Sequence, residues 1–442
     1  MSEPGISERR RREVIDALRR GTVPRNGLDA LAVGLQRFEA AVGEELDKIS
    51  GGGAVFKAVR GEYGAGKTFF SRWLVERARR RGMAAADVQV SENETPLHRL
   101  ETVYRRLTES LATAEYQPSA LRLVLDAWLF TLEEDALASG QTRENDPASL
   151  HATVDELLER RLAEVSRSAP SFAVALRAYR HAMVAGDTPV ADGLVAWLGG
   201  QPNVAASVRR TAGIRGDLDH FGALGFLQGL LAVLRDSGHP GLVVVLDEVE
   251  TLQRVRSDAR DRALNALRQL VDEVDGGRFP GLYLLITGTP AFFDGQQGAQ
   301  RLPPLAQRLA TDLATDPRFD NPRAVQLRLP GFDLDTLDEL GRRVRDLYAP
   351  GAREPQRLTE IVDDAYVHDL GRALTARLGG RTGITPRLFL KKLVGDVLDR
   401  VDQFPDFDPR QHYVLTLATA ELTDVERNAA AATPDDVPLD LP

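Results

Sequence analysis

Five short segments of the sequence have the pattern of β-strands. They occupy residues 54–60, 85–90, 242–246, 281–290 and 325–329. A continuous apolar run such as 242–246 is typical of a parallel strand that is buried on both faces. Between these segments, apolar residues recur every three or four positions, which indicates helices that cover a sheet. Strands that alternate with helices predict an α/β fold with a five-stranded parallel sheet.

The connection between the second and third predicted strands is far longer than an ordinary loop. Residues 97 to about 230 carry apolar residues at helical spacing over several segments, which predicts a large helical insertion. Amphipathic segments at 333–348, 357–378 and 386–402 predict a C-terminal helical lid, and 412–422 predicts one further strand. The predicted units are therefore an N-terminal helical segment at 1–50, a core at 51–330 that contains the insertion, a lid at 331–422 and a disordered acidic tail at 423–442.

Composition and charge exclude several classes of chemistry. The 442 residues include no cysteine and seven scattered histidines, which argues against disulfides, thiolate catalysis and a zinc site. The formal net charge of −9 provides no global basic field for nucleic acid. The N-terminus lacks the apolar core of a signal peptide, and no apolar run approaches the roughly 20 residues that span a bilayer. We expect a cytoplasmic protein.

A glycine-rich turn follows the first predicted strand. The phosphate-loop pattern G-x-x-x-x-G-K-[ST] fits Gly61, Glu62, Tyr63, Gly64, Ala65, Gly66, Lys67 and Thr68, and Phe69 continues into a helix-like run. An ordinary glycine-rich turn is the alternative, but strand, loop and helix together are the context that this motif requires. Backbone N–H groups and the helix N-terminus would then surround an anion. We expect Lys67 to reach the β- and γ-phosphates of ATP and the Thr68 hydroxyl to ligate Mg²⁺.

The use of lysine supports this interpretation of the loop. Five of the 56 basic residues are lysine, and one of the five is Lys67. A compact ammonium fits between phosphate oxygens, whereas a planar guanidinium does not.

The third predicted strand ends in two carboxylates, Asp247 and Glu248. Open α/β sheets bind their ligands at this carboxyl edge. We expect Asp247 to hold the Mg²⁺ shell and Glu248 to polarise the attacking water. An acidic helix cap after a core strand is the alternative, which the intact phosphate loop disfavours. Glu250 is interpreted as a solvated helix residue.

The fourth predicted strand, 281–290, ends in Thr287 and Thr289. A strand that lies between the loop strand and the acidic strand can present a polar group to the water and the γ-phosphate. We predict this role for Thr287, with Thr289 as the second choice. A Thr-Gly-Thr-Pro turn explains both residues without any catalytic role.

These motifs together resemble the AAA+ ATPases, and among them the origin-recognition and Cdc6-like branch. The resemblance is closer still to the ATP-binding proteins of the BREX phage-defence systems, and it rests on segments 20–34, 56–74, 244–254, 321–332 and 384–394. It spans most of the chain. It implies a protein that binds ATP and Mg²⁺, self-associates as an oligomer and works with other phage-defence proteins.

The resemblance also implies roles for residues outside the two main motifs. An arginine that reaches the γ-phosphate of a neighbouring subunit corresponds to Arg308, with Arg301, Arg318 and an ordinary surface role as alternatives. A lid arginine directed at the same phosphate corresponds to Arg387. The residues that flank the adenine correspond to Val23, Pro24 and Arg25.

Two departures from the AAA+ pattern concern DNA. The insertion enlarges the core, and its basic run at 207–221 is a candidate contact for nucleic acid. The chain after the lid is too short for a full winged-helix domain, which argues against duplex binding. DNA therefore stays open as a partner.

Two functions follow from these patterns. The first is an oligomeric ATPase that couples turnover to remodelling of its assembly, a partner or DNA. The alternative is a nucleotide-dependent switch or scaffold that binds ATP and docks partners with little hydrolysis. Glu248 favours the ATPase, because a pure binder has no use for a carboxylate that activates water. A phosphate-loop kinase is disfavoured, because nothing in the sequence corresponds to a lid over an acceptor site.

Overall fold

The computed structural model describes residues 6–140, 146–377, 386–418, 421–422 and 427. Its centre is an all-parallel sheet with the strand order β2-β3-β4-β1-β5. The strands are β1 (Val55–Arg60), β2 (Ala84–Gln89), β3 (Leu242–Asp247), β4 (Leu282–Gly288) and β5 (Gln326–Arg328). The five-stranded parallel sheet is thus confirmed. β4 lies between β1 and β3, which is the position expected for the strand that carries Thr287.

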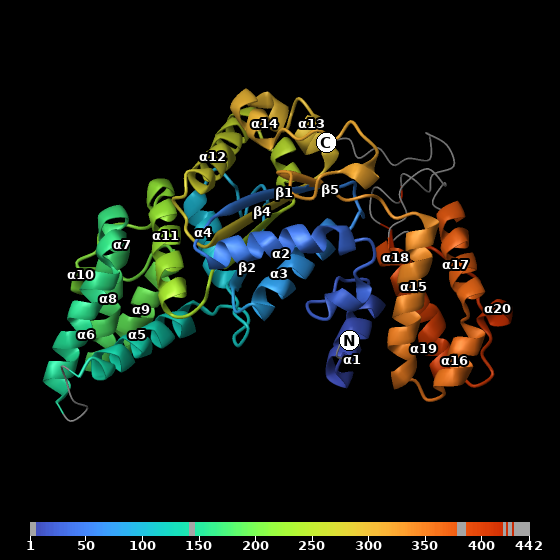
Figure 1. Ribbon diagram of the computed structural model, residues 1–442, viewed down its shortest axis with the longest axis horizontal. Helices are drawn as coiled ribbons and strands as arrows, with labels where there is room; N and C mark the ends of the chain where they lie inside the picture. The colour runs from blue at the N-terminus through green and yellow to red at the C-terminus, as the bar shows by residue number, and fades with distance from the viewer. Residues whose placement is uncertain (1–5, 141–145, 378–385, 419–420, 423–426, 428–442) are drawn as a thin grey trace.

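Helices cover both faces of the sheet (Figure 1). On one face lie α2 (Gln36–Ser50) and α3 (Lys67–Arg80), whose buried Phe38, Phe70 and Trp73 pack against β1, β3 and β4. The other face is covered by α4 (Leu100–Ser110), α11 (His220–Asp236) and α12 (Ser257–Asp275). Two short helices, α13 (Pro290–Asp294) and α14 (Pro303–Leu309), connect β4 to β5. This layering leaves the carboxyl ends of the strands open to the loops that follow them.

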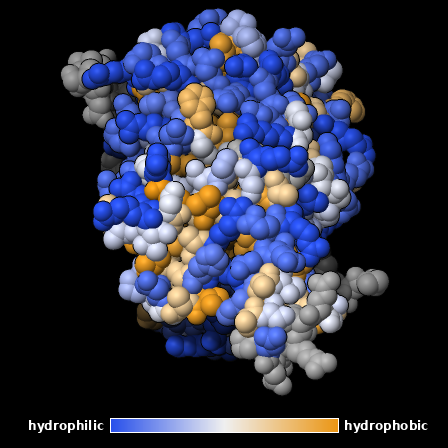
Figure 2. All heavy atoms as spheres, turned by 90° about the vertical axis from the view of Figure 1, so that its left-hand side faces the viewer, coloured by the Kyte–Doolittle hydropathy of each residue, from blue (hydrophilic) through white to orange (hydrophobic). Residues whose placement is uncertain are grey.

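The long connection between β2 and β3 is helical, as predicted. After α4 it forms α5 (Leu121–Ala138), α6 (Pro147–Arg161), α7 (Ala163–Ser168), α8 (Pro170–Ala185), α9 (Thr188–Leu198) and α10 (Ala206–Thr211), and then α11. Trp128, Trp197 and Phe226 belong to one continuous hydrophobic cluster that also includes the adjacent face of the sheet. The insertion is therefore packed against the core. Figure 2 shows its far end, where hydrophilic side chains surround smaller groups of apolar ones.

The C-terminal helices form a second hydrophobic cluster beside the sheet (Figure 1). They are α15 (Leu334–Tyr348), α16 (Pro355–Ile361), α17 (Asp364–Arg377), α18 (Pro386–Lys391), the π-helix η6 (Lys392–Leu398) and α19 (Asp399–Gln403). The first helix, α1 (Glu8–Arg19), packs into this cluster through Val14, Ile15 and Leu18. Arg19 also donates to both carboxylate oxygens of Asp399, at 2.6 and 2.8 Å. The N-terminal helix is thereby attached to the lid.

The strand predicted at 412–422 is wrong for the residues that the structure describes. The short helix α20 (Pro409–His412) ends there, and residues 413–418 have no regular secondary structure and pair with no strand. They lie on the lid cluster, where Leu415 is buried, and the five-stranded sheet of the described residues contains no strand from this segment. Residues 423–442, predicted as a disordered tail, lie outside the described residues apart from Arg427. In the described parts of the chain, every helix is too short or too polar to cross a membrane.

Candidate nucleotide site

The glycine-rich loop joins β1 to α3 in the conformation that its glycines permit. Gly64 and Gly66 have φ angles of 81° and 89°, in the left-handed region that side chains disfavour. Gly66 precedes α3 and offers no side chain to cap it. The first N–H groups of α3 are therefore available to an anion, with the positive end of the helix dipole behind them.

Lys67, the first residue of α3, folds back over the loop. Its Nζ donates to the carbonyl oxygens of Gly61 at 2.9 Å and Glu62 at 3.2 Å. Glu250 Oε1 lies 3.9 Å from the same nitrogen. The ammonium is thus held by groups that a phosphate oxygen can replace.

Asp247, at the end of β3, lies in a buried network that includes the phosphate loop. Thr68 Oγ1 donates to Asp247 Oδ2 at 3.2 Å. Thr287, which is fully buried on β4, donates its hydroxyl to Asp247 Oδ1. The backbone N–H of Glu248 lies 3.1 Å from the same Oδ1 and 3.3 Å from Thr287 Oγ1. The start of α3 and the neighbouring strands β3 and β4 therefore bring Thr68, Asp247 and Thr287 together, and Thr287 faces the carboxylate.

Glu248 has left-handed backbone angles, φ 62° and ψ 45°, which are uncommon for a side chain of this size. The turn begins the 3-10 helix η2 (Val249–Gln253). The Glu248 carboxylate accepts a hydrogen bond from Gln89 Nε2 at 2.9 Å. Sequence reasoning missed Gln89, which stands opposite Asp247 in the register of β2 and β3. Pairing the ends of the predicted strands would have drawn attention to it.

A cavity of about 290 Å³ lies over the carboxyl edge of the sheet. One end is polar and contains the phosphate loop together with Asp247, Glu248 and Glu250. The other walls are mainly apolar. They come from the segment between α1 and α2 and from the lid, and include Val23, Pro24, Leu31, Val33, Phe332, Arg387 and Leu390. One polar end and one apolar end suit a triphosphate and a base.

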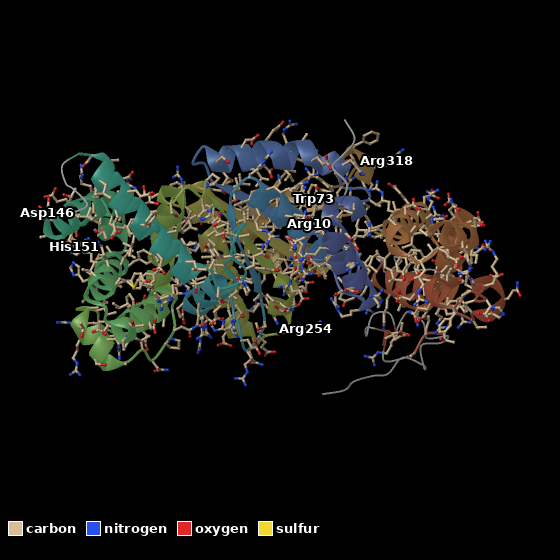
Figure 3. All side chains as sticks on the ribbon, turned by 90° about the horizontal axis from the view of Figure 1, so that it is seen from below. Arg10, Trp73, Asp146, His151, Arg254 and Arg318 are labelled. Carbon is tan, nitrogen blue, oxygen red and sulfur yellow. The ribbon has the colours of Figure 1, made fainter. Side chains whose placement is uncertain are left out.

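The segment that forms the apolar wall is attached to α3. Glu76 accepts hydrogen bonds from the backbone N–H groups of Gly27 and Leu28, both at 2.8 Å. Trp73, labelled in Figure 3, donates its indole N–H to Asp29 at 2.9 Å. The helix that begins at the phosphate loop thus also positions the apolar wall of the cavity.

Of the three residues expected near the adenine, two line the cavity. Val23 and Pro24 do so, whereas Arg25 is exposed and lies outside the lining.

The interpretation of Glu250 as a solvated residue is wrong. Its side chain is 17% exposed, lines the cavity and faces Lys67. Burial raises the pKa of Glu250, and the charges of Glu248 and Asp247 raise it further, against the lowering effect of its backbone hydrogen bond and of Lys67. The reason is the 3-10 turn after Glu248, which directs position 250 back toward the loop where an α-helical pattern would have left it in solvent.

Comparison with known proteins identifies the family of this chain. A family model described as "BREX system ATP-binding protein BrxC/D" matches residues 6–417. The chain belongs to the BrxC/D family. The match confirms the resemblance that the sequence motifs carried, and it makes this BrxC/D chain an ATP-binding protein of the BREX phage-defence type.

The chain was also compared with curated proteins and with solved structures. No curated protein matches the BrxC/D chain. Among solved structures, the chain is similar to the Aeropyrum pernix ORC2 protein, whose structure was determined as ADPNP and ADP complexes. The identity is 13%, the TM-score is 0.35, and the similarity covers 86% of this chain and 70% of that one.

The predicted arginines occupy different places in this BrxC/D chain. Arg387, at the start of α18, lines the cavity and donates from Nη2 to the carbonyl oxygen of Glu421 at 2.9 Å. Arg308, on α14, does not line the cavity and donates to Asp272 and to the Pro304 carbonyl. Its two competitors, Arg301 and Arg318, pair with Asp261 and Asp316. One predicted arginine thus lies in the cavity of its own chain, and three lie outside it.

Proposed function

We propose that this BrxC/D family member hydrolyses ATP with Mg²⁺ and couples the turnover to a change in its own assembly or in a bound defence partner. The observation that supports the proposal best is the convergence of two elements. Lys67 and Thr68 at the start of α3 meet Asp247, the last residue of β3, and the following Glu248 at one end of one cavity. These groups supply the positioning and electrostatic stabilisation on which phosphoryl transfer depends.

The donor set fits magnesium. Thr68 Oγ1 and Asp247 Oδ2 are hard oxygen ligands that lie 3.2 Å apart. The described residues contain no group of three or more histidine, aspartate or glutamate side chains that would hold a metal alone. Mg²⁺ suits such a sparse site, because it retains waters and takes its other ligands from the phosphates. When bound, it would neutralise charge on the β- and γ-phosphate oxygens.

The protein side chains then have distinct tasks. Lys67 exchanges its carbonyl partners for phosphate oxygens, because those carbonyls are neutral and the phosphate is charged. Glu248 orients the attacking water and accepts its proton. Thr287 holds Asp247 in place through a fully buried hydrogen bond. Arg387 offers its charge to the phosphates from the lid side of the cavity.

One observation favours the switch or scaffold as a second candidate. Gln89 already donates to Oε2 of Glu248, so one oxygen of the proposed base is engaged. A chain that keeps this hydrogen bond with nucleotide bound would hold ATP and hydrolyse it slowly.

Glu248→Gln and Lys67→Ala test the two halves of the site. Glu248→Gln should retain ATP binding and lower turnover by about tenfold or more, because the amide cannot accept the proton. Lys67→Ala should lose nucleotide affinity. Unchanged turnover in Glu248→Gln would remove that residue from the mechanism, and normal affinity in Lys67→Ala would overturn the assignment of the phosphate loop.

The role of assembly is tested by measuring the ATPase rate and the particle size together, with and without DNA. Turnover that rises with DNA in a multimer supports the remodelling ATPase, whereas a monomer with a flat response supports the switch.

Arg308 requires a mixing experiment, because we propose that it acts on a neighbouring subunit. Subunits that lack Arg308 should regain activity when mixed with subunits that lack Lys67, since mixed contacts then contain one complete site. Absence of this rescue would argue against a contact between subunits.

A further inference from the structure

A segment without regular secondary structure near the C-terminus lies on the lid and reaches Arg387 of the nucleotide cavity. We call this segment, residues 413–418 with 421–422, the strap. Leu415 is buried in the lid cluster, and Leu417 and Leu422 pack against it. Tyr413 OH donates to Asp396 on η6 at 3.0 Å. The strap is thus attached to the lid along its described length.

The end of the strap is fixed by a single carboxylate. Glu421 Oε1 lies 2.9 Å from Lys391 Nζ, and Oε2 lies 2.8 Å from Lys392 Nζ. The backbone N–H of Ala418 also donates to Oε2, at 3.3 Å. Burial opposes ionisation of Glu421, but the hydrogen bonds from the two lysines outweigh it and lower its pKa to about 2. The carboxylate is therefore charged and bound at any pH near neutrality.

The backbone of the same residue holds an arginine of the nucleotide cavity. Arg387 Nη2 donates to the carbonyl oxygen of Glu421 at 2.9 Å. Arg387 and Gly21 line the cavity together, and a Cβ at Gly21 would lie 3.7 Å from Arg387 Cγ. The guanidinium is thus placed between the strap on one side and the N-terminal segment on the other.

We propose that Glu421 is a positioning residue for the nucleotide site. Its carboxylate, gripped by Lys391 and Lys392, fixes its own carbonyl so that the Arg387 guanidinium is held at the cavity wall. The inference rests on the proposed function in one respect, namely that Arg387 contacts the phosphates.

Two physical effects follow from this arrangement. A long arginine side chain loses considerable rotamer freedom when it is fixed, and the strap imposes that loss before the nucleotide arrives. Glu421 also pairs with the two lysines of α18 and η6; without it Lys392 would keep Asp396, at 3.2 Å, whereas Lys391 would lose its carboxylate partner close to the cavity. Without Glu421 the site would keep its positive charge but lose its directed contact with the terminal phosphate.

The test is the preference for ATP over ADP, measured as the ratio of their dissociation constants in the full-length protein. Glu421→Ala should reduce this preference by about tenfold, since one charge-assisted contact is lost. Arg387→Ala should reduce it equally, and the double variant should lose no more than either single one. Glu421→Gln retains an acceptor for one lysine and should give an intermediate value.

Asp396→Asn is the matched control. Asp396 also pairs with Lys392, at 3.2 Å, and accepts a hydrogen bond from Tyr413 of the strap, and neither of these interactions involves Arg387. It should leave the ATP preference unchanged. If Asp396→Asn reduced the preference for ATP as much as Glu421→Ala does, any weakening of the strap would have the same effect, and the proposal would be overturned. Additive losses in the double variant, or no loss in Glu421→Ala, would overturn it as well.

The ratio of dissociation constants tests the positioning role of Glu421 separately from ATP hydrolysis. Binding ratios do not depend on hydrolysis, so a protein that binds ATP without turning it over still gives the result. If Glu421→Ala does not fold, the comparison of Glu421→Gln with Asp396→Asn decides, because only the former should alter the ratio. An unchanged ratio in Glu421→Gln would then refute the positioning role.

Discussion

Glu250→Gln removes a partly buried negative charge from the end of the cavity that is proposed to receive the phosphates. The carboxylate lies 3.9 Å from Lys67 Nζ and 17% of its side chain is exposed. Two unit charges at about 4 Å attract with roughly 4 kcal/mol at an effective dielectric constant near 20. Desolvation of both groups offsets much of this attraction, which leaves about 1.4 kcal/mol, or roughly tenfold in affinity. We therefore expect Glu250→Gln to bind ATP about tenfold more tightly than the natural chain.

Isothermal titration calorimetry with a non-hydrolysable ATP analogue measures this change. Glu62→Gln is the matched control, because Glu62 is a carboxylate of the phosphate loop that is exposed, so that solvent screens its charge. Glu62→Gln should change the affinity for ATP several-fold less than Glu250→Gln does. Added salt should reduce the change in ATP affinity caused by Glu62→Gln more than the change caused by Glu250→Gln, since screening acts mainly on exposed charges.

The pH dependence provides an independent check with a defined sign. Burial raises the pKa of Glu250, so the natural carboxyl takes up a proton as the pH falls toward that raised value. Protonation frees Lys67 in the same way as the substitution does. The gain in ATP affinity caused by Glu250→Gln should therefore be largest above the raised pKa of Glu250 and become smaller below it. The titration of ATP itself is common to both proteins and cancels in their ratio.

Weaker binding by Glu250→Gln would refute this reasoning. It would mean that the carboxylate assists the bound nucleotide and does not compete with it for Lys67. An advantage that does not change with pH would show that the effect is steric and not electrostatic.

Two predictions concern stability. Lys57→Met should lower the free energy of unfolding by about 3–5 kcal/mol in urea titrations, because Lys57 is buried on β1 and its loss leaves the Glu45 carboxylate, 2.5 Å from its Nζ, without its cation. Lys57→Met with Glu45→Gln should recover part of the loss; no recovery would mean that the packing of Lys57 matters more than its charge. Glu76→Ala should expose the backbone near Gly27 and Leu28 to proteolysis and weaken ATP binding, since two backbone N–H groups lose their acceptor. Unchanged proteolysis would show that other contacts hold this segment.

Local patterns predicted the features that depend on local structure. The phosphate loop needs glycines at positions of positive φ, and the sequence shows them directly. The apolar run of β3 ends at Asp247, so a buried strand and a carboxylate at its tip were visible together. The position of β4 between β1 and β3 is the one expected from the arrangement of strands in ATPase sheets, and the structure confirms it.

Features that depend on distant partners were missed for a physical reason. Arg19 and Asp399 are 380 residues apart, and nothing near either one indicates the other. The alternation at 412–422 has the pattern of a strand, but β-structure also needs a sheet edge, and this segment lies on helices. A helical period predicts that Glu250 faces solvent, but the chain makes a 3-10 turn there, and this turn directs the side chain toward the loop.

The N-terminal segment links the two halves of the cavity and gives a physical route from nucleotide binding to movement. Arg19, at the end of α1, is attached to Asp399 in the lid, whereas Gly27 and Leu28 are attached to Glu76 in the core. Any rotation of the lid relative to the sheet must be absorbed by the few residues between these two attachments, and Gly21, with φ 69°, begins that stretch. Because the same stretch lines the cavity, a bound base restricts the torsions through which the lid would move. Lid orientation and nucleotide occupancy are thus expected to be coupled, and the coupling can be no larger than the difference in nucleotide affinity between the two lid orientations.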